Sequence, residues 1–200
     1  MAAYTYTLTN ILLSTRTLLK ESTASFWTDA ILTSYINDGV RFIAEKTGCY
    51  RTIQSVSTET LVRLVPFTGY KCFAVEYNNI ALIKITTLQV GHAHLDSVYP
   101  QYWFEYGNYI GIEPIPPDIY SLNLYLISIP PALVNGTDVP VIPYSLCGLI
   151  TYYAVAKALE QDRKIGASAQ LMSIFYGELD FMSKALLQNI PDGEDNLRFI

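Results

Sequence analysis

The sequence has little charge and few cysteines. Charged residues make up 16% of the 200 residues and hydrophobic residues 50%, which is typical of a folded chain and excludes intrinsic disorder over most of its length. The three cysteines, Cys49, Cys72 and Cys147, are odd in number and form no C-x-x-C pair. We therefore expect neither a disulfide framework nor a zinc ribbon, and interpret the cysteines as reduced, small hydrophobic residues of a cytosolic protein.

Long apolar runs and clusters of basic residues are also missing. No run approaches the roughly 20 apolar residues that cross a bilayer, and the polar residues 1–9 do not form a signal peptide. We expect no membrane contact. The net charge of −5 argues against a nucleic-acid-binding protein, because phosphate binding requires clustered Lys and Arg. It is compatible with DNA passing nearby, since acidic or neutral walls prevent DNA from sticking.

Sequence signatures of catalysis are absent as well. There is no G-x-S-x-G elbow, P-loop, dinucleotide fingerprint or H-E-x-x-H, so we expect a non-enzymatic protein without a cofactor. His92, His94 and Asp96 would share one face of a strand, as metal ligands do. Nothing else in the chain supplies a ligand motif. We therefore interpret these three residues as part of a polar loop and expect no metal site.

Aromatic residues gather around three carboxylates in the middle of the chain, Glu105, Glu113 and Asp118. Glycosidases use a pair of carboxylates at a defined separation. The sequence does not give that separation, so these carboxylates are weak evidence for a glycosidase. Tyr and Trp also suit strand packing and subunit interfaces. A β-domain that binds carbohydrate or another ligand stays open as an alternative. We assign a subunit or tail interface to Tyr102, Trp103, Tyr106 and Tyr109.

Hydrophobic periodicity predicts helices at both ends of the chain. Apolar residues recur at helical spacing over residues 9–21 and again after Thr28, a suitable N-cap, as far as Gly48, which suits a C-terminal stop. Two more helices are expected between Leu146 and Leu186, with Gly166 marking the break between them.

The middle of the chain predicts strands. The clearest pair, residues 102–106 and 109–113, is joined by Gly107-Asn108, a turn that accepts positive φ. Residues 120–126 alternate with period two and place their leucines on one face. Other runs rich in Val, Ile, Thr and Tyr predict strands at residues 52–57, 60–65, 72–77 and 82–90.

These elements predict an α+β fold. We expect a helical bundle of about four helices with an antiparallel β-domain inserted between the N-terminal and C-terminal helices. Residues 1–49 and 138–188 would form the bundle and residues 50–137 the β-domain. Residues 189–200 read as an extended C-terminal tail, polar at first and apolar at its end.

Two blocks of sequence resemble tailed-bacteriophage head-to-tail connector proteins, also called adaptor or head completion proteins. The first is Trp27-x-Asp29, then Ile31-Leu32 and Tyr35-Ile36-Asn37-Asp38-Gly39-x-Arg41-x-Ile43, which resembles their opening helix. The second is Val139-Pro140 to Pro143, followed by the Leu149 to Leu159 helix with its Tyr152-Tyr153-Ala154-Val155-Ala156-Lys157-Ala158-Leu159 run. The order of helices and strands is similar to podovirus-type adaptors.

The resemblance implies a structural virion protein made in the host bacterial cytoplasm. Its copies would form a ring of about twelve subunits that joins the portal protein to tail or nozzle proteins, with DNA passing through the channel. Another tail protein, such as a tail terminator, stays open as an alternative. The resemblance also implies that the C-terminal tail binds the portal, through Asp195, Leu197, Arg198, Phe199 and Ile200.

Overall fold

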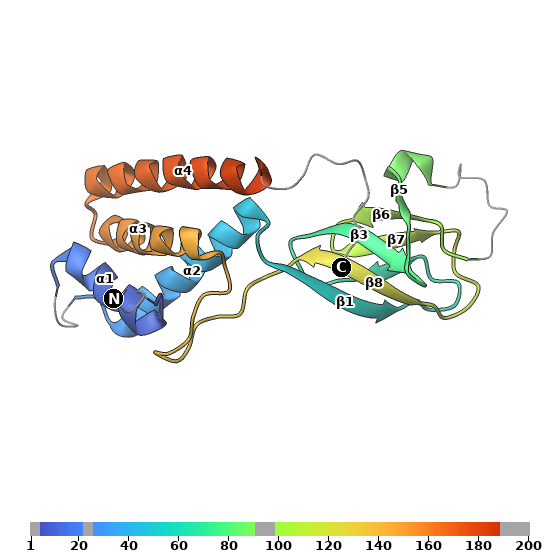
Figure 1. The fold of residues 1–200 in the computed structure, drawn as a ribbon, viewed down its shortest axis with the longest axis horizontal. Coiled ribbons are helices and arrows are strands. Elements are labelled where there is room, and N and C mark those ends of the chain that lie inside the picture. Colours follow the sequence, from blue (N-terminus) through green and yellow to red (C-terminus); the bar gives the residue numbers. More distant parts are fainter. Residues whose placement is uncertain (1–4, 22–25, 91–98, 189–200) are drawn as a thin grey trace. The chain divides into compact units, whose positions relative to one another are not determined.

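The computed structural model describes residues 5–21, 26–90 and 99–188 (Figure 1). In these ranges two helices are followed by eight short strands and then by two more helices, which confirms the predicted α+β class. Contacts divide the chain into two compact units, Met1–Thr47 with Pro130–Ile200, and Gly48–Ile129. We call them the helical unit and the β unit.

The first two helices begin and end at residues with clear capping roles. In α1 (Leu8–Leu19) the Thr7 side chain accepts a hydrogen bond from the Asn10 N–H. In α2 (Asp29–Thr47) Thr28 Oγ1 accepts from the Ile31 N–H at 3.3 Å, which confirms the predicted N-cap. Gly48 follows with φ +61°, as expected of a residue that ends a helix in the left-handed region.

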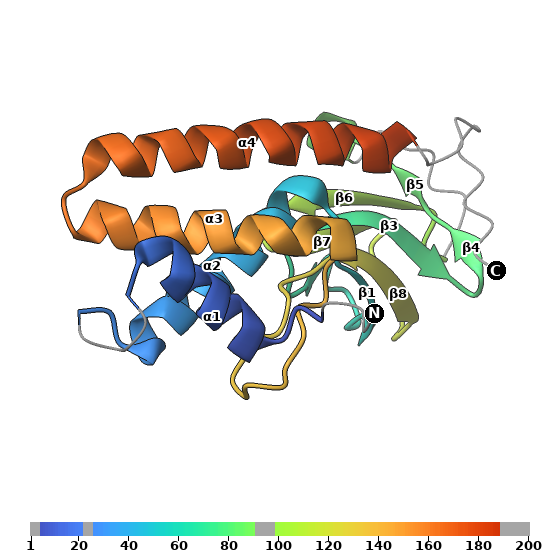
Figure 2. The ribbon, with the colours of Figure 1, turned by 60° about the vertical axis from the view of Figure 1, so that its left-hand side comes forward.

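The helix α3 (Tyr144–Gln161) is the centre of the helical unit. Ten of its residues are buried, and α1, α2 and α4 (Ile165–Gln188) all pack against it, with α4 running alongside it in Figure 2. The predicted break at Gly166 is wrong, because that glycine lies inside α4. The chain turns instead at Arg163, which takes φ +58°, while the next N–H, of Lys164, bonds back to the Leu159 carbonyl.

Residues 130–137 belong to the helical unit and are tied to α2 by one amide. Asn37 Nδ2 donates to the Leu133 carbonyl at 3.1 Å, and the Leu133 N–H donates to Asn37 Oδ1 at 2.8 Å. Leu133 itself is 4% exposed. A side-chain amide that satisfies both polar groups of one residue holds an extended segment as a neighbouring strand would.

We expect Asn37→Ala to lower the free energy of unfolding by about 2 kcal/mol, because it leaves a partly buried N–H and carbonyl without partners. Urea denaturation followed by circular dichroism measures the change. The matched control is Asn10→Ala, which removes an exposed bond to the Thr5 carbonyl and should cost less than about 0.5 kcal/mol. Equal losses in the two variants would contradict this role of Asn37.

The β unit consists of two four-stranded sheets that face each other across a shared core. The first has the order β1-β8-β3-β4 and the second the order β2-β7-β6-β5. Their core holds residues of both sheets, among them Val75 and Ile110. The bounds are β1 (Arg51–Ser57), β2 (Leu64–Pro66), β3 (Lys71–Tyr77), β4 (Ile80–Ala81), β5 (Ile83–Lys84), β6 (Tyr102–Tyr106), β7 (Tyr109–Glu113) and β8 (Ser121–Ile127).

The leucines of β8 bear out the predicted alternation. Leu122, Leu124 and Leu126 are at most 1% exposed, and the residues between them are half-buried. Both edges of β8 are hydrogen-bonded, to β1 on one side and to β3 on the other. The strand therefore differs only between its two faces, one of which is turned toward the core. A period-two pattern follows directly from that position.

Two of the predicted strands are wrong in extent. The run 82–90 is not one strand: its first part crosses from β4 to β5, and Thr87–Gln89 forms a 3-10 helix. Leu82 lies at the crossing, where its N–H bonds to Val75 in the first sheet while the next N–H, of Ile83, bonds to Gln101 in the second. The pairing of β5 with β6 is parallel. In the run 60–65 only Leu64 and Val65 belong to a strand.

Cys72 is a free thiol that is fully buried in the β core. Burial, with a smaller contribution from the nearby Glu105 carboxylate, raises the pKa of the Cys72 thiol to about 12. The folded state therefore favours the neutral thiol. The stability that the folded state gains from the neutral thiol is fully present below the pKa of the unfolded thiol, about 8.5. It is lost as the pH rises from there toward 12.

We expect wild type to lose stability relative to Cys72→Val as the pH is raised from about 8 to 11, because only wild type must keep a buried thiol neutral. Urea denaturation at a series of pH values measures the free energy of unfolding of each protein. Tyrosine titration is common to both proteins and cancels when the two free energies are subtracted. A constant difference across that range would contradict the prediction.

Candidate interaction surface

The β6–β7 hairpin presents two tyrosines at its turn. Tyr106 and Tyr109 are directly opposite each other in the register, and they are 63% and 45% exposed. Gly107, with φ +59°, and Asn108 make the turn between them, which confirms the predicted hairpin. Both rings lie on the surface, where tyrosine suits a protein interface.

The other two aromatic residues assigned to an interface lie elsewhere. Trp103 is 1% exposed and belongs to the core, with Lys84 Nζ 4.5 Å from the centre of its ring. Tyr102, at the opposite end of β6 from the turn, is half-buried and lines a pocket. The structure thus brings together Tyr106 and Tyr109 only, and Trp103 has no surface to offer a partner.

Two of the three carboxylates considered as catalytic candidates, Glu105 and Glu113, have structural partners. Glu105 accepts a hydrogen bond from the Cys72 N–H at 2.9 Å and pairs with Lys84 at 3.0 Å. Glu113 is 1% exposed and lies 3.1 Å from Arg63 Nη2. These contacts account for both side chains without a catalytic role.

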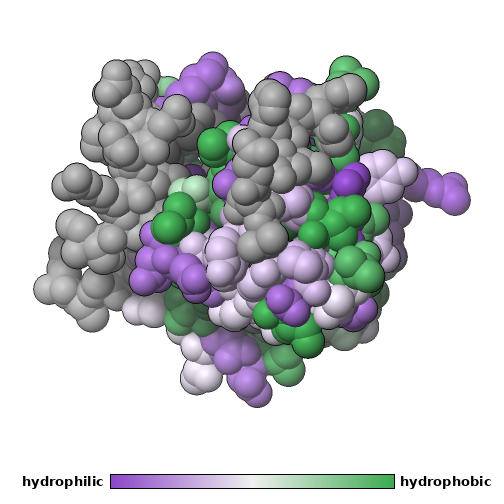
Figure 3. Space-filling view, turned by 90° about the vertical axis from the view of Figure 1, so that its right-hand side faces the viewer, coloured by the Kyte–Doolittle hydropathy of each residue, from purple (hydrophilic) through white to green (hydrophobic). Residues whose placement is uncertain are grey.

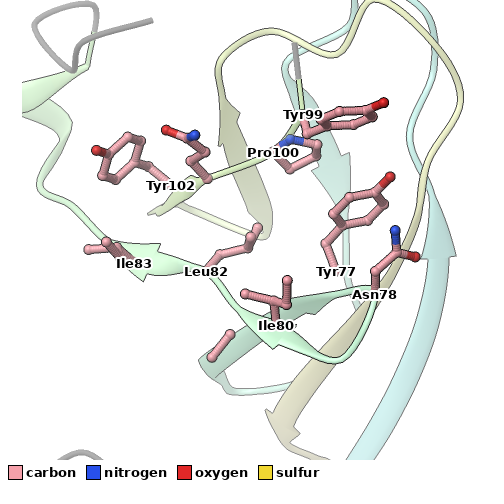
Figure 4. A pocket seen from close by; sticks show the side chains of 10 residues that line it. Tyr77, Asn78, Ile80, Leu82, Ile83, Tyr99, Pro100 and Tyr102 are labelled. Carbon is pink, nitrogen blue, oxygen red and sulfur yellow. The ribbon is translucent and has the colours of Figure 1, made fainter. Parts of the chain in front are cut away.

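A pocket of about 630 Å³ opens between the β4–β5 edge and the segment before β6 (Figure 4). Figure 4 shows Tyr77 and Tyr99 on one side and Ile83 and Tyr102 on the other. Its volume is within the range of small-molecule sites, and its wall is mostly apolar. The described lining residues are Tyr77, Asn78, Ile80, Ala81, Leu82, Ile83, Tyr99, Pro100, Gln101 and Tyr102.

Three tyrosines form a cluster at the rim of this pocket. The ring centres of Tyr77, Tyr99 and Tyr120 are 5.3 to 6.3 Å apart, with Tyr77 stacked on Tyr99 and Tyr120 edge-on to both. Desolvation, followed by the charge of Asp118, raises the pKa of Tyr120. The three rings together form an aromatic surface at the rim of the pocket.

Two hydrogen-bonded loops form an apolar tip next to the cluster. Residues 58–63 and 114–120 are joined by the Leu61 N–H to the Pro116 carbonyl at 2.8 Å and the Thr58 N–H to the Tyr120 carbonyl at 2.8 Å. Aliphatic side chains project from this framework rather than packing into it. The most exposed are Leu61 at 74% and Ile119 at 70%, followed by Ile115 at 42% and Val62 at 39%.

Several candidates fall outside the described residues. The loop with His92, His94 and Asp96 is one, and the C-terminal tail with Asp195, Leu197, Arg198, Phe199 and Ile200 is the other. Within the described ranges, no group of three or more His, Cys, Asp or Glu residues is placed to hold a metal ion. No helix in those ranges is long and apolar enough to span a membrane.

Comparison with known families covers nearly the whole chain. The family model described as SU10 adaptor protein matches residues 6–195. The chain belongs to the SU10 adaptor protein family. This confirms the predicted resemblance to phage head-to-tail adaptor proteins, and it favours a structural role for the adaptor. No curated protein matches the chain.

The sequence analysis missed the exposed aliphatic residues of this adaptor. Leu61 lies in a loop that the sequence pattern assigned to the strand 60–65, and Ile80 and Ile83 lie in short strands at sheet edges. Their periodicity resembles that of buried residues.

Proposed function

We propose that this adaptor is a structural virion protein whose copies form a ring, with about twelve subunits, that joins the portal to the tail. The observation that carries the proposal is the family match over residues 6–195. In the proposal the ring extends the DNA channel, and the protein contacts the portal on one side and tail or nozzle proteins on the other.

Exposed apolar side chains on both units support an assembly role. Leu13 and Phe181 of the helical unit are 65% and 71% exposed, and Leu61 and Ile119 of the β unit are 74% and 70% exposed. Single exposed residues need no explanation, whereas several gathered at one place mark interaction sites. Such surfaces are expected of a protein whose exposed apolar side chains become buried only when its copies assemble into a ring.

The charge of the chain supports passage of DNA without binding. With 13 Lys and Arg against 18 Asp and Glu, the net charge is −5, and many of the cations are held in ion pairs, such as Arg63 with Glu113 and Lys184 with Asp180. A channel with this balance gives phosphates few places to bind.

Electron microscopy of the adaptor mixed with its cognate portal tests the proposal. We expect an added ring at the outer end of the portal, with matching rotational symmetry. The adaptor alone can be a monomer if the portal templates the ring, so the free state is only a control. An assembled portal that acquires no ring would refute the proposal.

For portal binding we propose the C-terminal residues Asp195, Leu197, Arg198, Phe199 and Ile200. Three apolar side chains would enter grooves of the portal, and Arg198 would pair with a portal carboxylate. For contacts to neighbours or tail proteins we retain Tyr102, Tyr106 and Tyr109, which have exposed or half-buried rings. Trp103 is not retained, because it is buried.

Deleting residues 197–200 is expected to weaken portal binding by about a hundredfold, since it removes three apolar anchors and one cation. Biolayer interferometry with immobilised portal measures the affinity. The control is Arg198→Lys, which preserves the charge and should lose far less. Unchanged binding by the deletion variant would contradict the assignment of the tail.

A second candidate function rests on the pocket of the β unit. Aromatic rings beside the amides of Asn78 and Gln101 are suited to stacking on and hydrogen bonding to a sugar. Because Trp103 is buried, the informative variant in a glycan-array experiment is Tyr102→Ala. Glycan binding that this variant abolishes, together with failure to join the portal, would favour a ligand-binding domain. A tail terminator would instead bind tail tubes and not portals.

A further inference from the structure

The edge strands of the β unit differ in how well they are protected against pairing with another chain. They are β1 and β4 in the first sheet and β2 and β5 in the second. Both β4 and β5 have only two residues, and β2 has three and ends in Pro66, which has no N–H to donate. Short strands and prolines are usual ways of protecting an edge.

The edge of β1 has none of these protections. The strand has seven residues, none of them proline or lysine. Its register with β8 runs from Arg51 to Ser57 without a shift, and Figure 1 shows it as the outermost strand of its sheet. An edge of this length without a bulge is a template on which a further strand pairs.

The hydrogen bonds to β8 show which backbone groups of β1 face the open edge. The Thr58 N–H donates to the Tyr120 carbonyl at 2.8 Å, and the Ser128 N–H donates to the Tyr50 carbonyl at 2.9 Å. Because hydrogen-bonded pairs alternate along an antiparallel ladder, the even-numbered residues of β1 bond to β8. The odd-numbered residues direct their N–H and carbonyl groups away from the sheet, and no backbone group in the described ranges pairs with them. They are Arg51, Ile53, Ser55 and Ser57.

The side chains of the odd-numbered residues lie on the solvent face of β1. They are exposed, whereas the even-numbered residues between them are half-buried. Ile53, near the middle of the strand, is 61% exposed. A strand added at this edge would therefore cover part of an apolar side chain as well as satisfy the open backbone groups.

The occupant that fits this edge is an extended polypeptide. A row of alternating N–H and carbonyl groups is satisfied by the backbone of another strand. Scattered apolar side chains specify a partner less narrowly. Figure 3 shows such side chains, where hydrophobic residues interrupt the polar surface in several places among the atoms not drawn in grey.

The two ends of the β1 edge carry opposite charge. At its beginning, Arg51 and Lys71 lie in the same row across the first sheet. At its end, Glu59 follows the strand, and the Asp118 carbonyl accepts a hydrogen bond from the Thr58 hydroxyl at 3.2 Å. These four charged residues are exposed, and none forms an ion pair within the part of the chain that the structure describes.

We propose that two copies of the free protein pair along β1, antiparallel and about a two-fold axis. The first sheets of the two copies, with four strands each, then form one continuous sheet. In the fully paired register Arg51 lies opposite Ser57 of the second copy, and Ile53 lies opposite Ser55 of the second copy. Outward-facing residues meet outward-facing residues, so the open N–H and carbonyl groups of both strands gain partners.

The charges favour a second copy as the occupant and an antiparallel arrangement. The two-fold axis places the basic end of each edge against the acidic end of the other, so the attraction occurs twice. Arg51 becomes the diagonal neighbour of Glu59 of the second copy. Parallel pairing would instead bring the two Arg51 side chains together. The contact belongs to the free protein and does not rest on the proposed function, because the copies of a ring are related by rotation about a single axis.

Charge reversal with a compensating exchange tests the pairing. Sedimentation velocity of the full chain over a concentration series at low salt measures the dissociation constant of the dimer. Glu59→Arg brings two arginines together at both ends and should raise this constant about tenfold, whereas Arg51→Glu/Glu59→Arg should restore most of the affinity. The control is Glu178→Arg, the same change at an exposed position of the helical unit, which should leave the constant unchanged.

Two results of that experiment would overturn the proposal. One is a protein that stays monomeric throughout the concentration series. The other is an effect of Glu178→Arg as large as that of Glu59→Arg, which would show that net charge rather than the β1 edge governs association.

A backbone variant shows whether the dimer uses the β1 edge. The Ser55 N–H faces the open edge, so Ser55→Pro removes no bond to β8 and places proline where edge strands tolerate it. The matched control Ser55→Ala also loses the hydroxyl bond to Asn123 but keeps the N–H. We expect similar melting temperatures and a dimer dissociation constant at least about tenfold higher for Ser55→Pro than for Ser55→Ala.

The same pair of variants separates a second copy from other occupants. Equal dimer affinities of Ser55→Pro and Ser55→Ala would overturn the β1 contact. A monomeric wild type whose ring on the portal is lost in Ser55→Pro and kept in Ser55→Ala would assign the edge to a strand of a virion partner, which also overturns the proposal. Rings formed on the portal by both variants, together with the expected difference in dimer affinity, support it.

Discussion

Trp103→Ala is expected to lower the free energy of unfolding by about 4 kcal/mol, the usual range for removing a large aromatic side chain from a core. Its side chain is 1% exposed and packs with residues of both sheets. The loss includes the contact of Lys84 with its ring at 4.5 Å. Urea denaturation followed by far-ultraviolet circular dichroism measures the change without relying on tryptophan fluorescence.

The matched control is Tyr106→Ala on the same strand. Tyr106 is 63% exposed, so its removal should cost less than about 1 kcal/mol. Comparable losses in the two variants would contradict the assignment of Trp103 to the core and Tyr106 to the surface. The pair also decides which residue an interface experiment should use: a binding defect in Trp103→Ala would reflect unfolding, whereas one in Tyr106→Ala would report a contact.

Arg63→Ala is expected to cost about 2 kcal/mol, because it leaves the Glu113 carboxylate buried without its cation. The Glu113 side chain is 1% exposed, and Arg63 Nη2 is 3.1 Å from its Oε2. A fully buried pair would cost more to break. Arg63 is 32% exposed, so water replaces part of the lost interaction. Urea denaturation measures the loss.

A double-mutant cycle separates this charge effect from simple loss of packing. In Arg63→Ala/Glu113→Gln the buried group is a neutral amide, which is easier to desolvate than a carboxylate. We therefore expect the double variant to recover at least half of the stability lost in Arg63→Ala. Losses that simply add would show that the two side chains act independently.

Local sequence patterns correctly predicted those elements in which neighbouring residues alone decide the structure. Thr28 caps α2 because a hydroxyl at that position reaches the N–H three residues on, whatever the rest of the fold. Gly107 and Asn108 form a hairpin turn because their backbone accepts it. The leucines of β8 alternate because a strand between two neighbours has one buried face.

The two clearest errors have different causes, one a distant segment and the other a local helix end. Residues 82–90 have strand composition, but the chain leaves one sheet at Leu82 and joins the other at Ile83, which no local pattern records. Gly166 suggested a break between helices, yet the turn forms at Arg163, where backbone hydrogen bonds to α3 decide the end of the helix. At Leu82 a tertiary contact overrode strand propensity, whereas at Arg163 local hydrogen bonds to the last turn of α3 ended the helix before the glycine.

The candidate surface could be predicted only in part. Tyr106 and Tyr109 are exposed as an interface requires, and their position follows from the turn between them. Trp103 is on the same strand and looks the same to a sequence pattern, but its side of β6 faces the opposite sheet. The loops that carry Leu61 and Ile119 are joined by hydrogen bonds between residues more than 50 positions apart, so no local signal links them.

By itself the sequence determined the α+β class, the order of helices and strands and the family of adaptors, because periodicity, capping and motif spacing are properties of neighbouring residues. The tertiary structure alone decided which aromatic rings are buried and which aliphatic residues remain on the surface. It also decided that Tyr77, Tyr99 and Tyr120, from three separate segments, gather at the rim of one pocket. Which residues are buried and which strands lie at an edge depend on strand pairing, and the paired strands are far apart in the chain.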